Sequence, residues 1–303
     1  MILGASLVFV LIWSTGFVVA RFIDGSADPN TFLLLRFTTA GTVLLAVSIV
    51  ARVRRRLTLP GAKEVLAHLG IGAFMNGAYL SLGYMAVADG LPAGVMTLLG
   101  GWQPVLTILL TAALVRSVPR PGVLIGVGIS LVGVAAVLVP GVIADEGAGN
   151  APSAGIGPSL IGLGVLAVTA LSLGVMAQSR VRGTALLPAV AWQTFGGALV
   201  VACMAVLTGE GPPTWGPKLW LGLGWSVLVI SICGMLLMVH LTRTVSASYV
   251  SILVLTTPPL AALEALVLFG ERLTVVQWIG VVVTLAGVGL ATRPRPPAGA
   301  SRG

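Results

Sequence analysis

Residues 93–115 read AGVMTLLGGWQPVLTILLTAALV, an apolar run without a charged side chain and with a Trp-Gln-Pro triplet near its middle. A bilayer core about 30 Å thick is crossed by about 20 apolar residues in a helix. The run therefore predicts a membrane-spanning helix. Because Pro104 removes a backbone donor, the helix is expected to be interrupted there.

The same pattern returns later in the chain. Sliding residues 91–137 forward by 154 positions, without a gap, pairs Pro104 with Pro258. Matches among leucines count for little, since apolar helices resemble one another by composition alone. The glycines and other apolar residues that also match are Gly126 with Gly280, Gly133 with Gly287, Ala93 with Ala247, Leu99 with Leu253, Leu106 with Leu260 and Leu131 with Leu285. The aligned proline and glycines indicate two related halves.

The composition of the whole chain agrees with a lipid environment. Its 303 residues are 57% hydrophobic and 9% charged, with a mean hydropathy of +1.06, which leaves too little polar surface for a water-soluble globule. We expect an all-α polytopic membrane protein with ten transmembrane helices. Their approximate bounds are 2–22, 30–51, 65–88, 93–115, 122–140, 158–179, 187–207, 218–240, 246–269 and 275–292.

The charges are sorted between alternate connections. Thirteen of the 17 Lys and Arg residues lie in every second connection or at the C-terminus: Arg52, Arg54, Arg55, Arg56, Lys63, Arg116, Arg120, Arg180, Arg182, Arg243, Arg293, Arg295 and Arg302. Seven of the nine acids lie in the others: Asp24, Asp28, Asp89, Asp145, Glu146, Glu210 and Glu271. Cytoplasmic loops retain positive charge, so we expect both termini in the cytoplasm. In this setting the net charge of +8 indicates topology and headgroup contact, and nucleic acid is not expected as a partner.

One long connection divides the chain. Residues 141–157 are rich in Gly, Pro and Ser and are expected to form an outer loop between residues 1–140 and 158–292, with 293–303 as a cytoplasmic tail. Each half has five spans, an odd number, so the second half enters the membrane upside down. Such inverted repeats build transporters with a central cavity near the midplane.

Short motifs place this chain near a known family. They include Ile12-Trp13-Ser14-Thr15-Gly16-Phe17, Pro29 with Leu35-Arg36-Phe37 and Ala40, Pro104, Pro258, Gly270-Glu271-Arg272-Leu273-Thr274, Gln277, Gly280 and Gly287. The chain resembles the EamA-type carriers of the drug/metabolite transporter superfamily. One departure is Arg116-Ser117, where the family often repeats a Gly-Glu pair. The resemblance implies two five-helix EamA repeats and a carrier, often an exporter of amino acids, metabolites or toxic compounds, in the bacterial inner membrane.

Two ionisable residues lie within predicted spans. An ionisable group in hydrocarbon is costly, so Arg36 and Glu264 are candidates for ion coupling or for a charge pair. Both are expected at roughly 8 to 10 Å from the outer end of their spans, at 1.5 Å per residue. Glu264 is either a proton site or the partner of Arg36. The alternative for Arg36 is an arginine that only fixes helix packing.

Candidate substrate-binding residues are polar or aromatic groups in the spans. An amide or an aromatic face in a cavity orients a polar organic ligand. The set is Trp13, Asn76, Tyr79, Trp102, Gln103, Thr256 and Thr257, with Pro104 and Pro258 as hinges. Pro258 is expected to leave carbonyls near Val254 free, although a merely packed kink is the alternative. Tyr84, near a span end, is expected to be interfacial.

Small features complete the prediction. Thr274 and Gln277 form a potential capping box, and Gly270 a helix end. Gly122 with Gly126, and Gly280 with Thr284, predict close helix packing, within one chain or in a homodimer.

The favoured function is a secondary carrier of a small organic solute, working by alternating access, with protons as a candidate coupling ion. The sequence has no phosphate-binding loop for ATP. A membrane-embedded enzyme is disfavoured because no HExxH motif or intramembrane acid pair is present, and a passive channel-like subunit is a further alternative. Cys203 and Cys233 lack metal-ligand spacing, and neither a metal nor a cofactor is expected.

Overall fold

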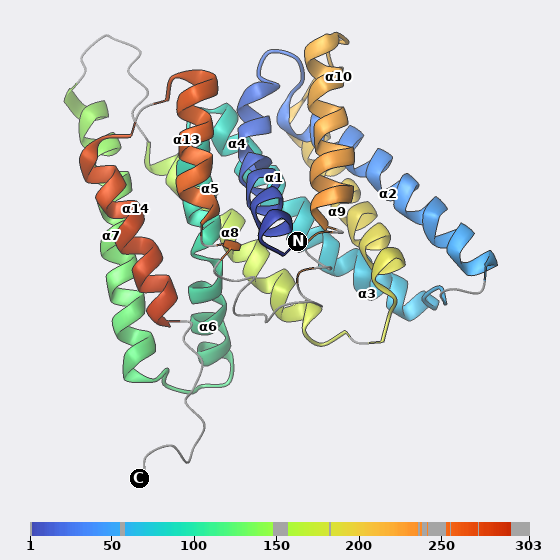
Figure 1. Ribbon diagram of the computed structural model, residues 1–303, viewed down its shortest axis with the longest axis horizontal. Helices are drawn as coiled ribbons and strands as arrows, with labels where there is room; N and C mark the ends of the chain where they lie inside the picture. The colour runs from blue at the N-terminus through green and yellow to red at the C-terminus, as the bar shows by residue number, and fades with distance from the viewer. Residues whose placement is uncertain are drawn as a thin grey trace.

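The computed structural model describes residues 2–54, 58–147, 157–181, 183–235, 237, 241, 253–254, 256–271 and 273–291 (Figure 1). All regular structure in these residues is helical, and they include no strand. The prediction of an all-α membrane protein is therefore confirmed at this level.

The first half of the sequence forms three continuous helices and one broken one before a long last helix. Their bounds are α1 Ile2–Phe22, α2 Pro29–Val53, α3 Ala62–Gly72 continuing through the π-helical segment η1 Ala73–Ala78 into α4 Tyr79–Ala88, α5 Ala93–Gly101, α6 Gln103–Leu114 and α7 Pro121–Gly147. α7 continues to Gly147, inside the stretch 141–157 that was expected to form a loop.

The second half of the chain is also helical where the structure describes it. It consists of α8 Pro158–Gln178, α9 Leu186–Thr208, α10 Pro217–Gly224 with the π-helical segment η2 Trp225–Gly234, α13 Thr257–Phe269 and α14 Val275–Ala291.

Six helices of the described part are long and apolar enough to cross a membrane, and a seventh span results if α5 and α6, bent by 40°, are taken together. The six are Leu3–Phe22, Pro29–Val53, Ala62–Ala88, Pro158–Gln178, Leu186–Thr208 and Pro217–Gly234. Shorter apolar helices are Pro121–Val137, Thr257–Phe269 and Val275–Ala291. The multi-pass membrane character is thus established, while the count of ten spans stays a prediction.

The turn before α14 has the expected local chemistry. The Thr274 backbone N–H donates to Gln277 Oε1 at 2.9 Å, and the Gln277 N–H donates to Thr274 Oγ1 at 3.3 Å, which confirms the capping box. Gly270 ends α13 with a φ of 72°, in the left-handed region that glycine adopts without strain. Helix α14 therefore starts where its sequence predicts.

Helices α7 and α14 pack against each other along one side of the molecule (Figure 1). A Cβ on Gly126 would lie 2.7 Å from the Gly287 carbonyl oxygen, and a Cβ on Gly133 would lie 2.7 Å from that of Gly280. Only glycine permits this approach of two backbones. The small-residue packing is therefore within one chain. Gly122 has nothing within 4 Å of its Cβ position and does not take part, contrary to expectation.

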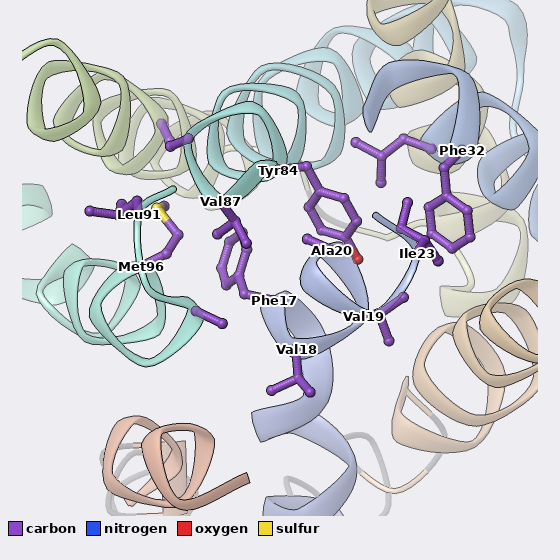
Figure 2. Packing of buried hydrophobic residues seen from close by; sticks show 14 of the residues in the cluster. Phe17, Val18, Val19, Ala20, Ile23, Phe32, Tyr84, Val87, Leu91 and Met96 are labelled. Carbon is purple, nitrogen blue, oxygen red and sulfur yellow. The ribbon is translucent and has the colours of Figure 1, made fainter. Parts of the chain in front are cut away.

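The main hydrophobic cluster lies where α1, α2, α4 and α5 converge (Figure 2). Phe17 of α1, Phe32 of α2, Tyr84 of α4 and Met96 of α5 are all at most 5% exposed. Helix α2 also packs extensively on α9, so this cluster joins the early helices to the second half.

Candidate functional site

The α5–α6 break is held by polar contacts to neighbouring helices. Trp102 Nε1 donates to Ser130 Oγ of α7 at 2.8 Å. Gln103 Nε2 donates to Thr107 Oγ1 at 2.6 Å, and Ser172 Oγ of α8 donates to the Gln103 carbonyl at 3.4 Å. Pro104 stands in the first turn of α6. The side chains of Trp102 and Gln103 at the break are thus hydrogen-bonded in this conformation.

The second proline break is built differently from what the sequence indicates. Helix α13 begins at Thr257, so Pro258 lies in its first turn, where a proline costs no helical hydrogen bond. The carbonyl of Val254, expected to be free, accepts a hydrogen bond from Thr257 Oγ1 at 2.7 Å. The carbonyl of Leu253 accepts one from Thr256 Oγ1 at the same distance. These two hydroxyls therefore satisfy backbone groups in this conformation.

The two breaks lie next to each other. A Cβ on Gly101 would be 3.4 Å from Pro258 Cγ, an ordinary van der Waals distance, so the end of α5 touches the start of α13. Tyr79 adds to this region, because its hydroxyl lies 2.7 Å from the Cβ position of Gly100. Tyr79, Trp102, Gln103, Pro104 and Pro258 are consequently gathered around one junction of α4, α5, α6 and α13.

Glu264 lies on α13 where that helix packs against α1. Its Oε1 accepts a hydrogen bond of 2.6 Å from Ser14 Oγ, and Ser14 is fully buried. Its Oε2 is buried without a hydrogen-bond partner. A buried carboxylate with one oxygen unsatisfied is costly unless it gains a proton or a cation. Among the described residues, one oxygen of the Glu264 carboxyl therefore lacks a hydrogen-bond partner.

Arg36 lies in a different environment, with two hydroxyl partners and an aromatic neighbour. Its Nη1 donates to Tyr84 Oη at 3.2 Å, its Nε donates to Ser231 Oγ of η2 at 3.3 Å, and its guanidinium lies 5.9 Å from the centre of the Phe37 ring. Arg36 is 5% exposed. It does not pair with Glu264: the ion pairs found among the described residues all involve Arg21. The charge-pair alternative is therefore not realised in this conformation.

Tyr84 is the residue that sequence reasoning missed in this network. It was expected at the interface, yet it is fully buried between Phe17 and Phe32, and its hydroxyl donates to the Gly16 carbonyl at 2.8 Å (Figure 2). The signal in the sequence was Arg36 itself, because a buried guanidinium requires acceptors. Arg36 and Tyr84 connect α2, α4, α1 and η2.

The remaining candidates lie apart from one another. Trp13 of α1 is 37% exposed and stacks at 5.2 Å, between ring centres, on Phe9. Asn76 of η1 lies against Gly197 of α9. The structure therefore brings one group of candidates to the breaks and leaves Trp13, Asn76 and Arg36 at separate helix contacts.

A protein-family model described as the EamA-like transporter family matches residues 1–139 and 158–293, nearly the whole chain. The chain belongs to the EamA-like transporter family. It is therefore a multi-pass membrane protein of the drug/metabolite transporter superfamily, whose members are transporters. A solved structure titled only "Crystal structure of protein" is similar over 95% of both chains, with a TM-score of 0.59 and 20% identity, which shows a shared fold. No curated protein matches the chain.

Two cavities of this EamA-like chain are lined by residues other than the candidates. One, of about 220 Å³, is lined by residues that include Asp24, Asp28, Tyr84 and Thr214. The other, of about 290 Å³, is lined by Ala262, Leu266, Glu271, Leu273 and Trp278. The central cavity expected between the halves stays a prediction. Among the described residues, no group of three or more His, Cys, Asp or Glu side chains is placed to hold a metal ion.

Proposed function

We propose that this EamA-like protein is a secondary carrier that exports a small organic solute by alternating access between two inverted five-helix halves. Both termini are placed in the cytoplasm and the membrane is the bacterial inner membrane. Energy comes from an ion or solute gradient. Contacts between the halves and the unsatisfied carboxyl oxygen of Glu264 support this proposal.

The inverted repeat is supported by the α7–α14 contact. The 154-residue shift carries Gly126 onto Gly280, and it carries Gly133 onto Gly287. It therefore converts the observed contact between Gly126 and Gly287 into the observed contact between Gly280 and Gly133. An interface that maps onto itself in this way is what a two-fold axis between two antiparallel halves produces. The separate matching of residues 1–139 and 158–293 to the family model agrees with two units.

The contacts between other helices support the same symmetry. The shift places α1 on α8, α2 on α9, and α6 on the region of α13. Helix α1 packs on α13, and α8 packs correspondingly on α6, while α2 and α9 pack on each other. Alternating access then requires only that contacts on one side of the axis exchange with those on the other.

The proposed mechanism depends on the surroundings of Glu264. The carboxyl connects α13 of the second half to Ser14 of α1 in the first half, and its Oε2 has no partner. Because a proton or a cationic group satisfies that oxygen, loading of the site changes the stability of the α1–α13 contact. Coupling follows, since a ligand that binds one state better shifts the equilibrium toward that state. Glu264 is therefore proposed as the ion-coupling residue.

The two adjacent proline breaks are proposed as the hinge and solute region. Trp102, Gln103 and Tyr79 lie at the junction, and the hydroxyls of Thr256 and Thr257 lie at the start of α13. When the hinge moves, the carbonyls of Leu253 and Val254 exchange their hydroxyl partners for a solute. Trp13, which lies near Gly234 of η2, is proposed to supply an aromatic face.

The test is counterflow in proteoliposomes. Candidate solutes are first identified by thermal stabilisation of the purified protein, and uptake is then measured with imposed pH gradients. We expect saturable counterflow that depends on the gradient and is lost in Glu264→Gln. Glu64→Gln, which changes a half-buried glutamate at the start of α3, should retain it. Flux without saturation and counterflow would identify a channel and exclude the carrier. Flux of Glu264→Gln at the wild-type rate, with the same pH dependence, would remove the coupling role.

A further inference from the structure

The turn between α13 and α14 is seated against the outer ends of α1 and α5 by one acidic side chain. Glu271 Oε1 lies 3.7 Å from Arg21 Nε at the end of α1, and the Ala93 backbone N–H at the start of α5 also bonds the Glu271 carboxyl. Glu271 follows Gly270 at the end of α13, so the contact joins the second half of the chain to the first. Under the proposed topology, this contact is on the outer face.

The charge of Glu271 is poorly compensated where the α13–α14 turn contacts α1 and α5. Arg21 is shared, because its Nη1 lies closer, at 3.3 Å, to Asp24 Oδ2. The second oxygen of Glu271, Oε2, is buried and has no hydrogen-bond partner. An ionised carboxylate is therefore held here with one distant cation and one unsatisfied oxygen, whereas a protonated carboxyl loses much less on leaving water.

Among the described residues, the other charged groups near Glu271 do not compensate its charge. Helix α5 contributes only its backbone, and on α13 the nearest ionisable residue is Glu264, two turns deeper. Lys218 of α10 donates to the Asp24 carbonyl at 2.6 Å and so belongs to the neighbouring turn. Arg272 lies outside the described residues.

We propose that Glu271 is a pH-sensitive closure of the outer face: protonated, it keeps the α13–α14 turn seated on α1 and α5, and ionised, it loosens the seat and favours outward opening. The inference rests on the proposed alternating access for its meaning in transport. The closure itself is a property of the protein without any solute.

The direction of the pH effect follows from linkage. Burial raises the pKa of the Glu271 carboxyl above its ordinary value, and Arg21 and the Ala93 N–H offset part of that rise. In an open state the hydrated carboxyl returns to its ordinary, lower pKa. The seated state therefore binds the proton more tightly, so its stability is fully present in acid and is lost as the pH rises through the raised pKa.

The experiment measures the distance between the α1–α2 turn and the start of α14 by double electron–electron resonance, in proteoliposomes without solute. Spin labels are placed on Thr214→Cys and Val275→Cys after Cys203 and Cys233 are replaced by serine. Thr214 is exposed and its backbone N–H donates to the Ser26 carbonyl, so it reports the α1–α2 turn, and exposed Val275 reports the start of α14. We expect a longer-distance population that grows about two- to tenfold between about pH 5 and pH 8.

Three variants separate the closure from a general loosening. Glu271→Gln, a permanently neutral carboxyl analogue, is expected to stay seated at both pH values. Arg21→Gln removes the compensating cation and moves the transition up by roughly 0.2–0.7 pH unit. Asp24→Asn frees Arg21 for Glu271 and moves it down.

The closure is overturned if the wild-type distance does not respond to pH, if Glu271→Gln responds like wild type, or if Arg21→Gln and Asp24→Asn move the transition in the same direction. Because no solute is present, a failed counterflow assay with an intact distance response would reject the carrier and keep the closure. The reverse result would reject only the closure.

Discussion

Glu210 and Glu264 both connect the second half of the chain to the first, and their surroundings are opposite. Glu210, after α9, accepts hydrogen bonds from the Asn30 N–H at 3.2 Å, from Asn30 Nδ2 at 2.7 Å and from the Thr31 N–H at 2.7 Å. These backbone donors belong to the first turn of α2, so Glu210 caps that helix from another segment. Glu264 has only the Ser14 hydroxyl and one unpartnered oxygen.

The contrast separates a carboxylate that stabilises the fold from one that is proposed to bind a proton or a cation. A carboxylate with several N–H donors on both oxygens gains nothing from a further ligand, so its contribution is to stability. A carboxyl with an unsatisfied buried oxygen is costly to folding and is available to a proton or a cation. Single substitutions at each carboxylate and its contacts should therefore have different effects on transport and on stability.

The largest effect is expected at Glu264. Glu264→Gln keeps the size and the hydrogen bond from Ser14 but removes the exchangeable charge, so coupled transport should fall about 10- to 100-fold, the range of a coupling free energy of 1–3 kcal/mol. The midpoint of thermal unfolding should not fall, because the substitution removes a buried charge and leaves a neutral amide in its place. Initial rates of counterflow and unfolding of the same preparation are the measurements. A destabilised but active variant would reverse the comparison.

The α7–α14 contact extends the comparison to a region without any charge. Gly133→Ala places a Cβ 2.7 Å from the Gly280 carbonyl oxygen, so the two helices must separate, and the free energy of unfolding should fall by about 1–3 kcal/mol. Gly128→Ala is the matched control on the same helix, with open space at its Cβ position. Chemical unfolding in detergent compares them. Equal stabilities would mean that α7 and α14 do not pack as described.

Glu210 should behave as a structural residue. Glu210→Gln leaves one first-turn N–H of α2 facing an amide donor, and we expect a loss of about 1–2 kcal/mol in the free energy of unfolding with transport retained. Glu64→Gln is the control, because Glu64 accepts a single N–H bond, from Gly61, at 2.9 Å. Its expected loss is about 0.5 kcal/mol. A transport defect in Glu210→Gln at full stability would contradict the assignment.

The smallest effect is expected at Ser14. Ser14→Ala removes the single donor to Glu264 and keeps the carboxyl, so transport should change only about two- to fivefold, corresponding to one hydrogen bond of about 1 kcal/mol. Counterflow rates across a pH series provide the test. A loss as large as that of Glu264→Gln would show that the hydroxyl, rather than the carboxyl, is the essential group.

Much of the fold was predictable because it depends on local chemistry. Apolar runs of spanning length gave helices whose described ends lie close to the predicted ones, as for α1, α2, α8 and α9. Thr274 and Gln277 predicted their own capping box, since both partners are three residues apart. The end of α7 was missed because residues 141–147 have the composition of a loop and yet continue the helix.

The candidate site was less predictable because its contacts join distant residues. The sequence singled out Arg36 and Glu264 as charges in apolar spans and gave a pair between them as one alternative. In the structure Arg36 donates to Tyr84 and Ser231, and Glu264 accepts from Ser14. The carbonyl of Val254 was expected to be free, and Thr257 in the next turn satisfies it. Depth along a span can be counted from sequence, whereas the side chain that lies opposite cannot.

The lipid environment, the helices and the family could be predicted from the amino-acid sequence, because composition and the spacing of prolines and glycines act within a segment. Only the tertiary structure decided that Gly126 meets Gly287, that Glu210 is saturated and that Glu264 is not. The physical reason is that a membrane helix is apolar on every side, so hydrophobic periodicity does not fix its rotation. Close backbone packing and a few polar contacts fix it, and these exist only after folding.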